Sequence, residues 1–145
     1  MLTEPEVHAR YVANAEQYAK LLNIEAETMI YMSRQIYLPA LIKYSASVAA
    51  SVATKADIGI PARAEKELVR TLTQGIDDIS ARTDELEERN DAAHALGDPR
   101  AQDDAYVSDV VPAMEALRAA VDDMELLCSR DIWPVPSYNE MLFYV

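Results

Sequence analysis

The sequence predicts an all-α protein, and three observations carry that prediction. Half of the 145 residues are apolar and only three are glycine, which favours helices over turns and disorder. Apolar residues recur at steps of three, four or seven through most of the chain, the spacing of one helical face. Strong turn signals stand at only two places, residues 57–61 and 97–99. We therefore expect one domain over residues 1–145, an antiparallel three-helix bundle of long, coiled-coil-like helices with an extended Pro/aromatic C-terminal tail.

The first helix is predicted over residues 4–54. Pro5 falls in its first turn, where proline is tolerated. Pro39 lies inside it and is expected to kink the helix or split it in two. Residues 41–53 are small and apolar, which predicts close packing against neighbours. The predicted buried face consists of Val7, Tyr11, Ala15, Tyr18, Leu22, Met29, Met32, Ile36 and Ala40.

The second helix is predicted over residues 62–96, between a turn at Gly59 and Pro61 and a cap at Gly97. Its apolar positions alternate steps of four and three, as in a coiled coil. Arg82 and Arg89 fall on this stripe and predict a seam that loosens or becomes exposed towards its far end. The predicted stripe consists of Leu68, Leu72, Gly75, Ile79, Arg82, Leu86, Arg89, Ala93 and Leu96.

The third helix is predicted over residues 100–129 and has the most regular heptad pattern. Pro112 interrupts it near the start, so we expect a kink, or a fresh helix start capped by Ser108 or Asp109. Cys128 is expected to be a small core residue. The predicted buried positions are Val107, Val110, Met114, Leu117, Val121, Met124 and Cys128.

The charge distribution excludes two classes of partner. The net charge is −12, and residues 61–145 hold nineteen acids against eight bases. Such a surface repels nucleic acid and anionic membranes, and no membrane span or signal peptide is expected. The single cysteine allows no intrachain disulfide, which is consistent with a reducing compartment. The expected location is the cytoplasm.

Reactive constellations are scarce. Asp91 and His94 have the acid-x-x-His spacing of di-metal bundle proteins. The only other histidine, His8, has Glu4 four residues upstream instead of three, so no metal site is predicted. The chain contains neither a glycine-rich phosphate loop nor an arguable nucleophile-base pair. From the residues alone it is a helical structural or interaction module, with no catalytic, cofactor-binding or metal-binding residue.

Three segments resemble a known family. They are NIEAETMIYM at residues 23–32, QIYLPA at 35–40, and WPVPSYNEMLF at 133–143. Together and in this order they resemble the carboxy-terminal helical domain of type III glutamine synthetases, over residues 7–145. The resemblance implies a parent ligase of nitrogen metabolism that joins ammonia to glutamate with ATP and Mg²⁺ in a large ring-shaped oligomer. It also implies that the catalytic residues belong to a preceding barrel domain, so this chain has no active site.

The tail, residues 132–145, is the expected docking element. It concentrates the only Trp and the only Phe of the chain, and buried aromatic residues commonly dominate interfaces. Its predicted partners are the catalytic domain and other subunits of the parent enzyme, with self-association of the chain as a further possibility. The alternative interpretation is a free-standing helical interaction module. The predicted docking residues are Trp133, Pro134, Tyr138, Met141, Leu142 and Phe143.

Overall fold

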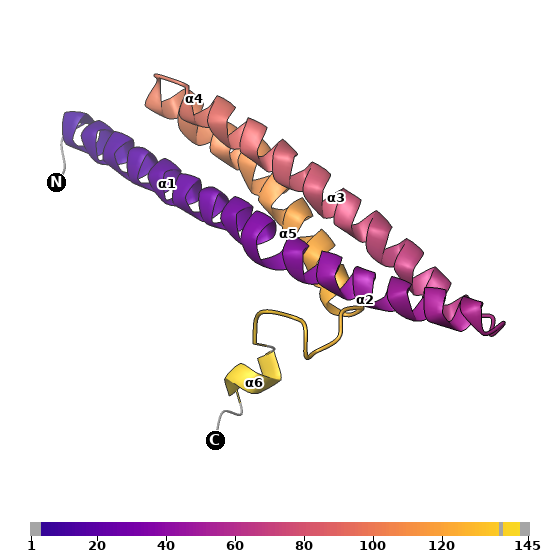
Figure 1. The fold of residues 1–145 in the computed structure, drawn as a ribbon. Helices are drawn as coiled ribbons and strands as arrows, with labels where there is room; N and C mark the ends of the chain where they lie inside the picture. Colours follow the sequence, from indigo (N-terminus) through magenta and orange to yellow (C-terminus); the bar gives the residue numbers. More distant parts are fainter. Residues whose placement is uncertain (1–3, 137, 143–145) are drawn as a thin grey trace. The chain divides into compact units, whose positions relative to one another are not determined.

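All regular structure in the described part of the chain is helical (Figure 1). The computed structural model describes residues 4–136 and 138–142, without most side chains before Gln17 and without those of Tyr138 and Asn139. The all-α prediction is confirmed, whereas the antiparallel three-helix bundle stays a prediction. The elements are α1 (Glu4–Met32), η1 (Ser33–Tyr37), α2 (Leu38–Asp57), α3 (Arg63–His94), α4 (Pro99–Ala105), η2 (Tyr106–Val110), α5 (Val111–Glu125) and α6 (Tyr138–Leu142), where η marks a π-helical turn.

The chain divides into two compact units. Unit 1 contains Met1–Tyr31 and Ala81–Arg118, and unit 2 contains Met32–Ser80 and Ala119–Val145. Each unit therefore combines helical segments that are far apart in the sequence. The long helices α1, α3 and α5 pass from one unit into the other.

In unit 1 the buried face of α1 differs from the predicted one. The buried residues are Ala19, Leu22, Ala26 and Ile30, and of these only Leu22 was predicted. Tyr18 was predicted to be buried but is 44% exposed. The small side chains of Ala19 and Ala26 are buried, whereas the large ring of Tyr18 stays partly in water. Predicted positions 7, 11 and 15 lie among the side chains that are not described.

The buried stripe of α3 is correct at every second position. Leu72 and Ile79 in unit 2, and Leu86 and Ala93 in unit 1, are buried as predicted. The positions between them are Thr83, 1% exposed, and Asn90, 3% exposed, instead of the predicted arginines. Arg82 and Arg89 lie one residue to the side, at the edge of the interface. The prediction that arginines lie on the seam is wrong, because small polar side chains occupy it, whereas Leu96 at its far end is 41% exposed.

Both interior prolines are accommodated by a π-turn. The amide of Leu38 donates to the Ser33 carbonyl, and the amide of Val111 donates to the Tyr106 carbonyl, each five residues back. Pro39 and Pro112 follow directly, and each would clash with the carbonyl four residues before it in a regular α-helix. The wider π-turn relieves this clash without breaking the chain's helical path. Ser108 and Asp109 lie inside η2 and the helix continues through them, so the alternative of a fresh helix start capped by either residue is wrong.

The π-turn also rotates the helical faces. Tyr106 is fully buried, whereas the predicted Val107 is 52% exposed. Val110, Leu117, Val121, Met124 and Cys128 are buried as predicted. The extra residue in η2 therefore moves the buried face by one position on its N-terminal side.

In unit 2 the helix α2 buries very little of its surface. Leu41 is the only buried residue among its twenty. Within the helical stretch Gln17–Asp57, an 18-residue window with a mean hydropathy of 1.3 is long and apolar enough to cross a membrane, and 6% of that window is buried. By length and composition alone, the expectation that no segment could span a membrane is wrong. An apolar surface helix meets the same criterion.

Candidate docking surfaces

The tail is attached to unit 2 by an aromatic stack. After α5 ends at Glu125, the chain turns and continues without regular structure to α6. The ring of Trp133 stacks on that of Tyr37 in η1, with centroids 5.3 Å apart and planes inclined by 24°. Trp133 is 6% exposed. The π-turn at Pro39 thus also presents the ring that receives the tail.

The Tyr37 side chain is electrostatically perturbed at this contact. Burial raises the pKa of the Tyr37 hydroxyl, and the carboxylates of Glu125 and Asp122 raise it further. In the described part of the chain the indole Nε1 of Trp133 is buried without a hydrogen-bond acceptor. A buried unpaired donor costs about 1–3 kcal/mol, so the stacking and burial of the ring must offset this cost.

Arg130 braces the rest of the tail. Its guanidinium donates to the carbonyl of Val135 at 3.2 Å and forms an ion pair with the carboxylate of Glu140 in α6. The two contacts join the start of the tail to its middle and to its short helix. Both partners of the ion pair are about half exposed, so its contribution to stability is small. Its effect is to limit the positions that α6 can take.

The predicted docking residues therefore fall into three groups. Trp133 is buried against the chain itself, so it anchors the tail internally. Pro134 is exposed, and Met141 and Leu142 are 57% and 68% exposed on α6. The side chain of Tyr138 and all of Phe143 lie outside the described residues.

A polar cluster in unit 1 was not predicted. The Oδ1 atom of Asn23 in α1 accepts from Asn90 Nδ2 of α3 at 2.9 Å and from the Tyr106 hydroxyl at 3.2 Å. Burial raises the pKa of Tyr106, with smaller effects of Glu27 and Asp91 in the same direction. A single buried Asn at a coiled-coil core position typically fixes the register of the helices. In the sequence, the signal for this cluster was the heptad spacing of two small polar residues, Thr83 and Asn90.

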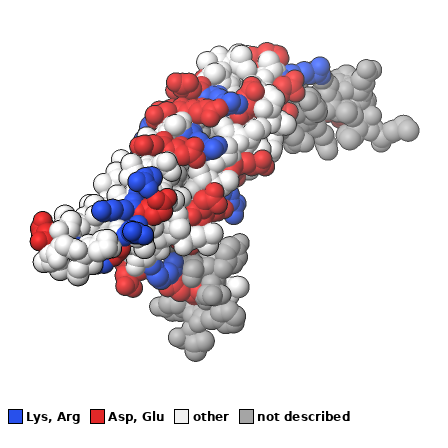
Figure 2. Space-filling model, turned by 90° about the vertical axis from the view of Figure 1, so that its right-hand side faces the viewer, with Lys and Arg blue, Asp and Glu red and all other residues white. Residues whose placement is uncertain are grey.

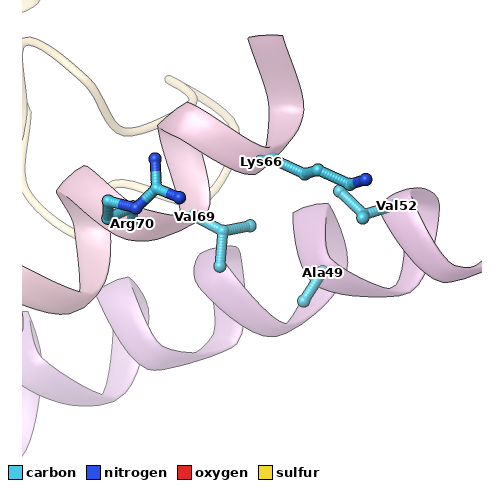
Figure 3. A pocket seen from close by; sticks show the side chains of 5 residues that line it. All are labelled: Ala49, Val52, Lys66, Val69 and Arg70. Carbon is cyan, nitrogen blue, oxygen red and sulfur yellow. The ribbon is translucent and has the colours of Figure 1, made fainter. Parts of the chain in front are cut away.

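A groove lies between α2 and α3 in unit 2 (Figure 3). Its volume is about 310 Å³, and Ala49, Val52 and Val69 supply its apolar lining. Lys66 and Arg70, one turn apart on α3, add two positive charges. Figure 2 shows acidic groups over much of the visible face and one gathering of Lys and Arg.

Chemical groups for catalysis are scarce in the described chain. Among the residues that the structure describes, no group of three or more His, Cys, Asp or Glu side chains could hold a metal ion. Cys128 is buried, and this burial raises the pKa of its thiol.

Comparison with known proteins identifies relatives of one kind. Residues 1–56 match the sequence model of the glutamine synthetase C-terminal domain. A glutamine synthetase of Butyrivibrio fibrisolvens is 26% identical over 145 residues, 99% of this chain and 21% of the relative. A glutamine synthetase of Bacteroides fragilis (strain YCH46) is 22% identical over 149 residues, 99% of this chain and 20% of the relative. The chain spans about a fifth of the length of these relatives. These similarities support the predicted relation to the C-terminal domain of glutamine synthetase.

Proposed function

We propose that the chain is the non-catalytic C-terminal domain of a type III glutamine synthetase and that its tail docks on the rest of the enzyme. The observation that carries the proposal is the way the tail is held. Trp133 and Arg130 fix its base to unit 2, while Met141 and Leu142 project apolar side chains into solvent. An exposed apolar pair on a braced helix loses little conformational entropy when a partner covers it.

The proposed assignment of catalysis to the rest of the enzyme, and of assembly or regulation to this domain, is based on the relatives and on the residues present. The relatives are four to five times longer than the chain and are named glutamine synthetase. Ligation of ammonia to glutamate, with its ATP and Mg²⁺, then belongs to the part of a cytoplasmic parent enzyme that precedes this domain. This domain contributes to assembly or regulation of the parent by binding the catalytic domain or another subunit.

The test replaces the exposed pair in the full-length enzyme. The variant Met141→Ser/Leu142→Ser is compared with Leu126→Ser/Leu127→Ser, which alters two exposed leucines before the tail. We expect the tail variant to yield smaller assemblies in mass photometry and lower activity per subunit, and the control to match the wild type. Unchanged assembly size and activity in the tail variant would exclude the docking role.

A second measurement addresses the absence of an active site. The purified 145-residue chain is incubated with ATP, glutamate and ammonium, and glutamine is assayed. We expect no turnover. Glutamine formation by the chain alone would contradict the proposal. An open reading frame without a glutamine synthetase barrel upstream would favour the free-standing interaction module instead.

A further inference from the structure

The groove between α2 and α3 is an apolar surface that unit 2 leaves uncovered. Ala49 and Val52 of α2 line it together with Val69 of α3, and Ala49, Ala50 and Ala53 are exposed. Such small side chains let another helix approach closely, because no long side chain holds its backbone away. The groove therefore has the shape and lining that suit a helix.

The charge at this end of unit 2 is opposite to that of the whole chain. Residues 43–70 hold five Lys and Arg against three Asp and Glu, whereas the chain has a net charge of −12. Lys66 and Arg70 line the groove itself. Arg70 also pairs with Glu67 on the exposed side of α3. An occupant with carboxylates beside its apolar residues would match this surface.

An exposed face of α1 in unit 1 has the complementary chemistry. Leu21, Ile24 and Tyr31 are 52%, 60% and 63% exposed. At about 100° per residue they lie on the side of the helix opposite Leu22, Ala26 and Ile30, which are buried. A helix that is apolar on two opposite faces requires a second partner in addition to its own core.

Charged residues flank this α1 face. Glu25 and Glu27 are exposed beside the apolar residues, and Glu27 accepts a hydrogen bond from Asn23. Lys20 is the basic residue on the same stretch. Over residues 1–31 five acids oppose two bases. The face thus combines large apolar side chains with a net negative charge.

We propose that the α2–α3 groove of one copy of the chain binds the α1 face of a second copy. Leu21, Ile24 and Tyr31 of one copy would cover the apolar lining, and Glu25 and Glu27 would lie near Lys66 and Arg70. The two surfaces differ, so the contact is head-to-tail and a further copy can join at each end. The proposal does not depend on the tail and goes beyond the proposed function.

A second copy fits this surface better than a lipid bilayer does. Membrane-surface helices insert large side chains such as Trp, Phe and Leu. The groove is instead lined by the smaller side chains of Ala49, Val52 and Val69. The acidic remainder of the chain would also be repelled by anionic lipid.

A charge-swap experiment tests the contact. Sedimentation velocity of the 145-residue chain at low salt is expected to show self-association with a dissociation constant of about 10–100 µM, weakened by added salt. Lys66→Glu/Arg70→Glu should weaken it by about tenfold, and so should Glu25→Lys/Glu27→Lys. Mixing the two variants should restore association, because the reversed groove of one then meets the reversed α1 face of the other.

Matched controls separate this contact from other effects. Arg100→Glu/Arg118→Glu changes the net charge of unit 1 by the same amount as the groove variant and should not alter association. Circular dichroism checks that every variant is folded. Met141→Ser/Leu142→Ser should associate like the wild type, which distinguishes this contact from tail docking.

Three results would overturn the proposal. They are a wild-type chain that remains monomeric throughout the concentration series, a mixture of the swapped variants that stays dissociated, and a chain that binds phosphatidylglycerol vesicles while remaining monomeric.

Discussion

Replacing Gly75 with alanine tests the packing of α3 against α5 in unit 2. Gly75 lies inside α3, where a glycine costs about 1 kcal/mol relative to alanine. On helix propensity alone, Gly75→Ala would raise the free energy of unfolding by about 1 kcal/mol. The added Cβ would lie 2.0 Å from Sδ, 2.7 Å from Cε and 2.9 Å from Cγ of Met124. Met124 is 8% exposed, so its side chain has little space into which to move.

The magnitude follows from the balance of these two terms. Forcing an extra methyl group into a filled core typically costs about 1–3 kcal/mol. Offset against the gain of about 1 kcal/mol in helix propensity, the net loss of stability is about 0–2 kcal/mol. The sign should reverse when Met124 is shortened to alanine, because the new methyl group then enters the space that the methionine leaves. In that background Gly75→Ala should stabilise by about 1 kcal/mol or more.

Urea unfolding followed by circular dichroism measures all four members of this double-mutant cycle. We expect a coupling free energy of about 2 kcal/mol between positions 75 and 124. Gly97→Ala is the control, because nothing lies within 4 Å of a Cβ at that position. If Gly75→Ala raises stability by the same amount with Met124 and with Ala at position 124, the two helices do not pack as described.

Three further perturbations probe other contacts. Asn23→Leu leaves both Asn90 Nδ2 and the Tyr106 hydroxyl without their acceptor, so urea unfolding should show a loss of about 2–4 kcal/mol, whereas Tyr106→Phe should cost about 1 kcal/mol. Raised native pKa values at Tyr37 and Tyr106 mean that the native state holds these protons more tightly than the unfolded chain. Stability, measured as the urea midpoint, should therefore fall as the pH rises above about 10, and Phe at both positions should flatten this decline. Tyr37→Ala removes the stacking partner of Trp133, the only tryptophan, so its fluorescence emission should shift to longer wavelength.

The sequence was sufficient to predict helices, but it identified the buried face of α3 only in part. Leu72, Ile79, Leu86 and Ala93 follow from apolar spacing alone. The buried residues between them, Thr83 and Asn90, are polar. The predicted apolar stripe therefore ran through the neighbouring Arg82 and Arg89 instead. Arg89 in fact lies at the rim, where it donates to the Asp109 carbonyl and pairs with Glu85. A heptad pattern that also admits small polar residues predicts the buried face of α3 with Thr83 and Asn90 on it.

The face of the third helix was predicted correctly from Val110 onward, except that Ala113 is buried in place of Met114. Proline signals a perturbation but does not specify whether the helix breaks, kinks or widens. A π-turn adds a residue to the turn before Pro112, which places Tyr106 in the core and Val107 in solvent. The outcome depends on the surroundings of the Tyr106 ring. Its hydroxyl donates to Asn23, which lies 83 positions earlier in the sequence. Local spacing does not contain that information.

The same limit applies to the tail, where the sequence gave all the predicted docking residues one role. Aromatic and proline content marked residues 132–145 as an element that must bind something. Trp133 binds its own chain through Tyr37, while Met141 and Leu142 remain exposed. Between these two groups, Arg130 contacts both Val135 and Glu140, residues that follow the buried ring.

The most informative disagreement concerns α2. Its small apolar residues predicted close packing against neighbours, yet within its own unit only Leu41 is buried. Amphipathic spacing reports which face of a helix avoids water, and it does not report which chain covers that face. An apolar face left bare costs solubility unless a partner covers it. The exposed residues of α2 therefore fit the proposed contact between copies of the chain, in which the basic side chains beside them would face an acidic surface.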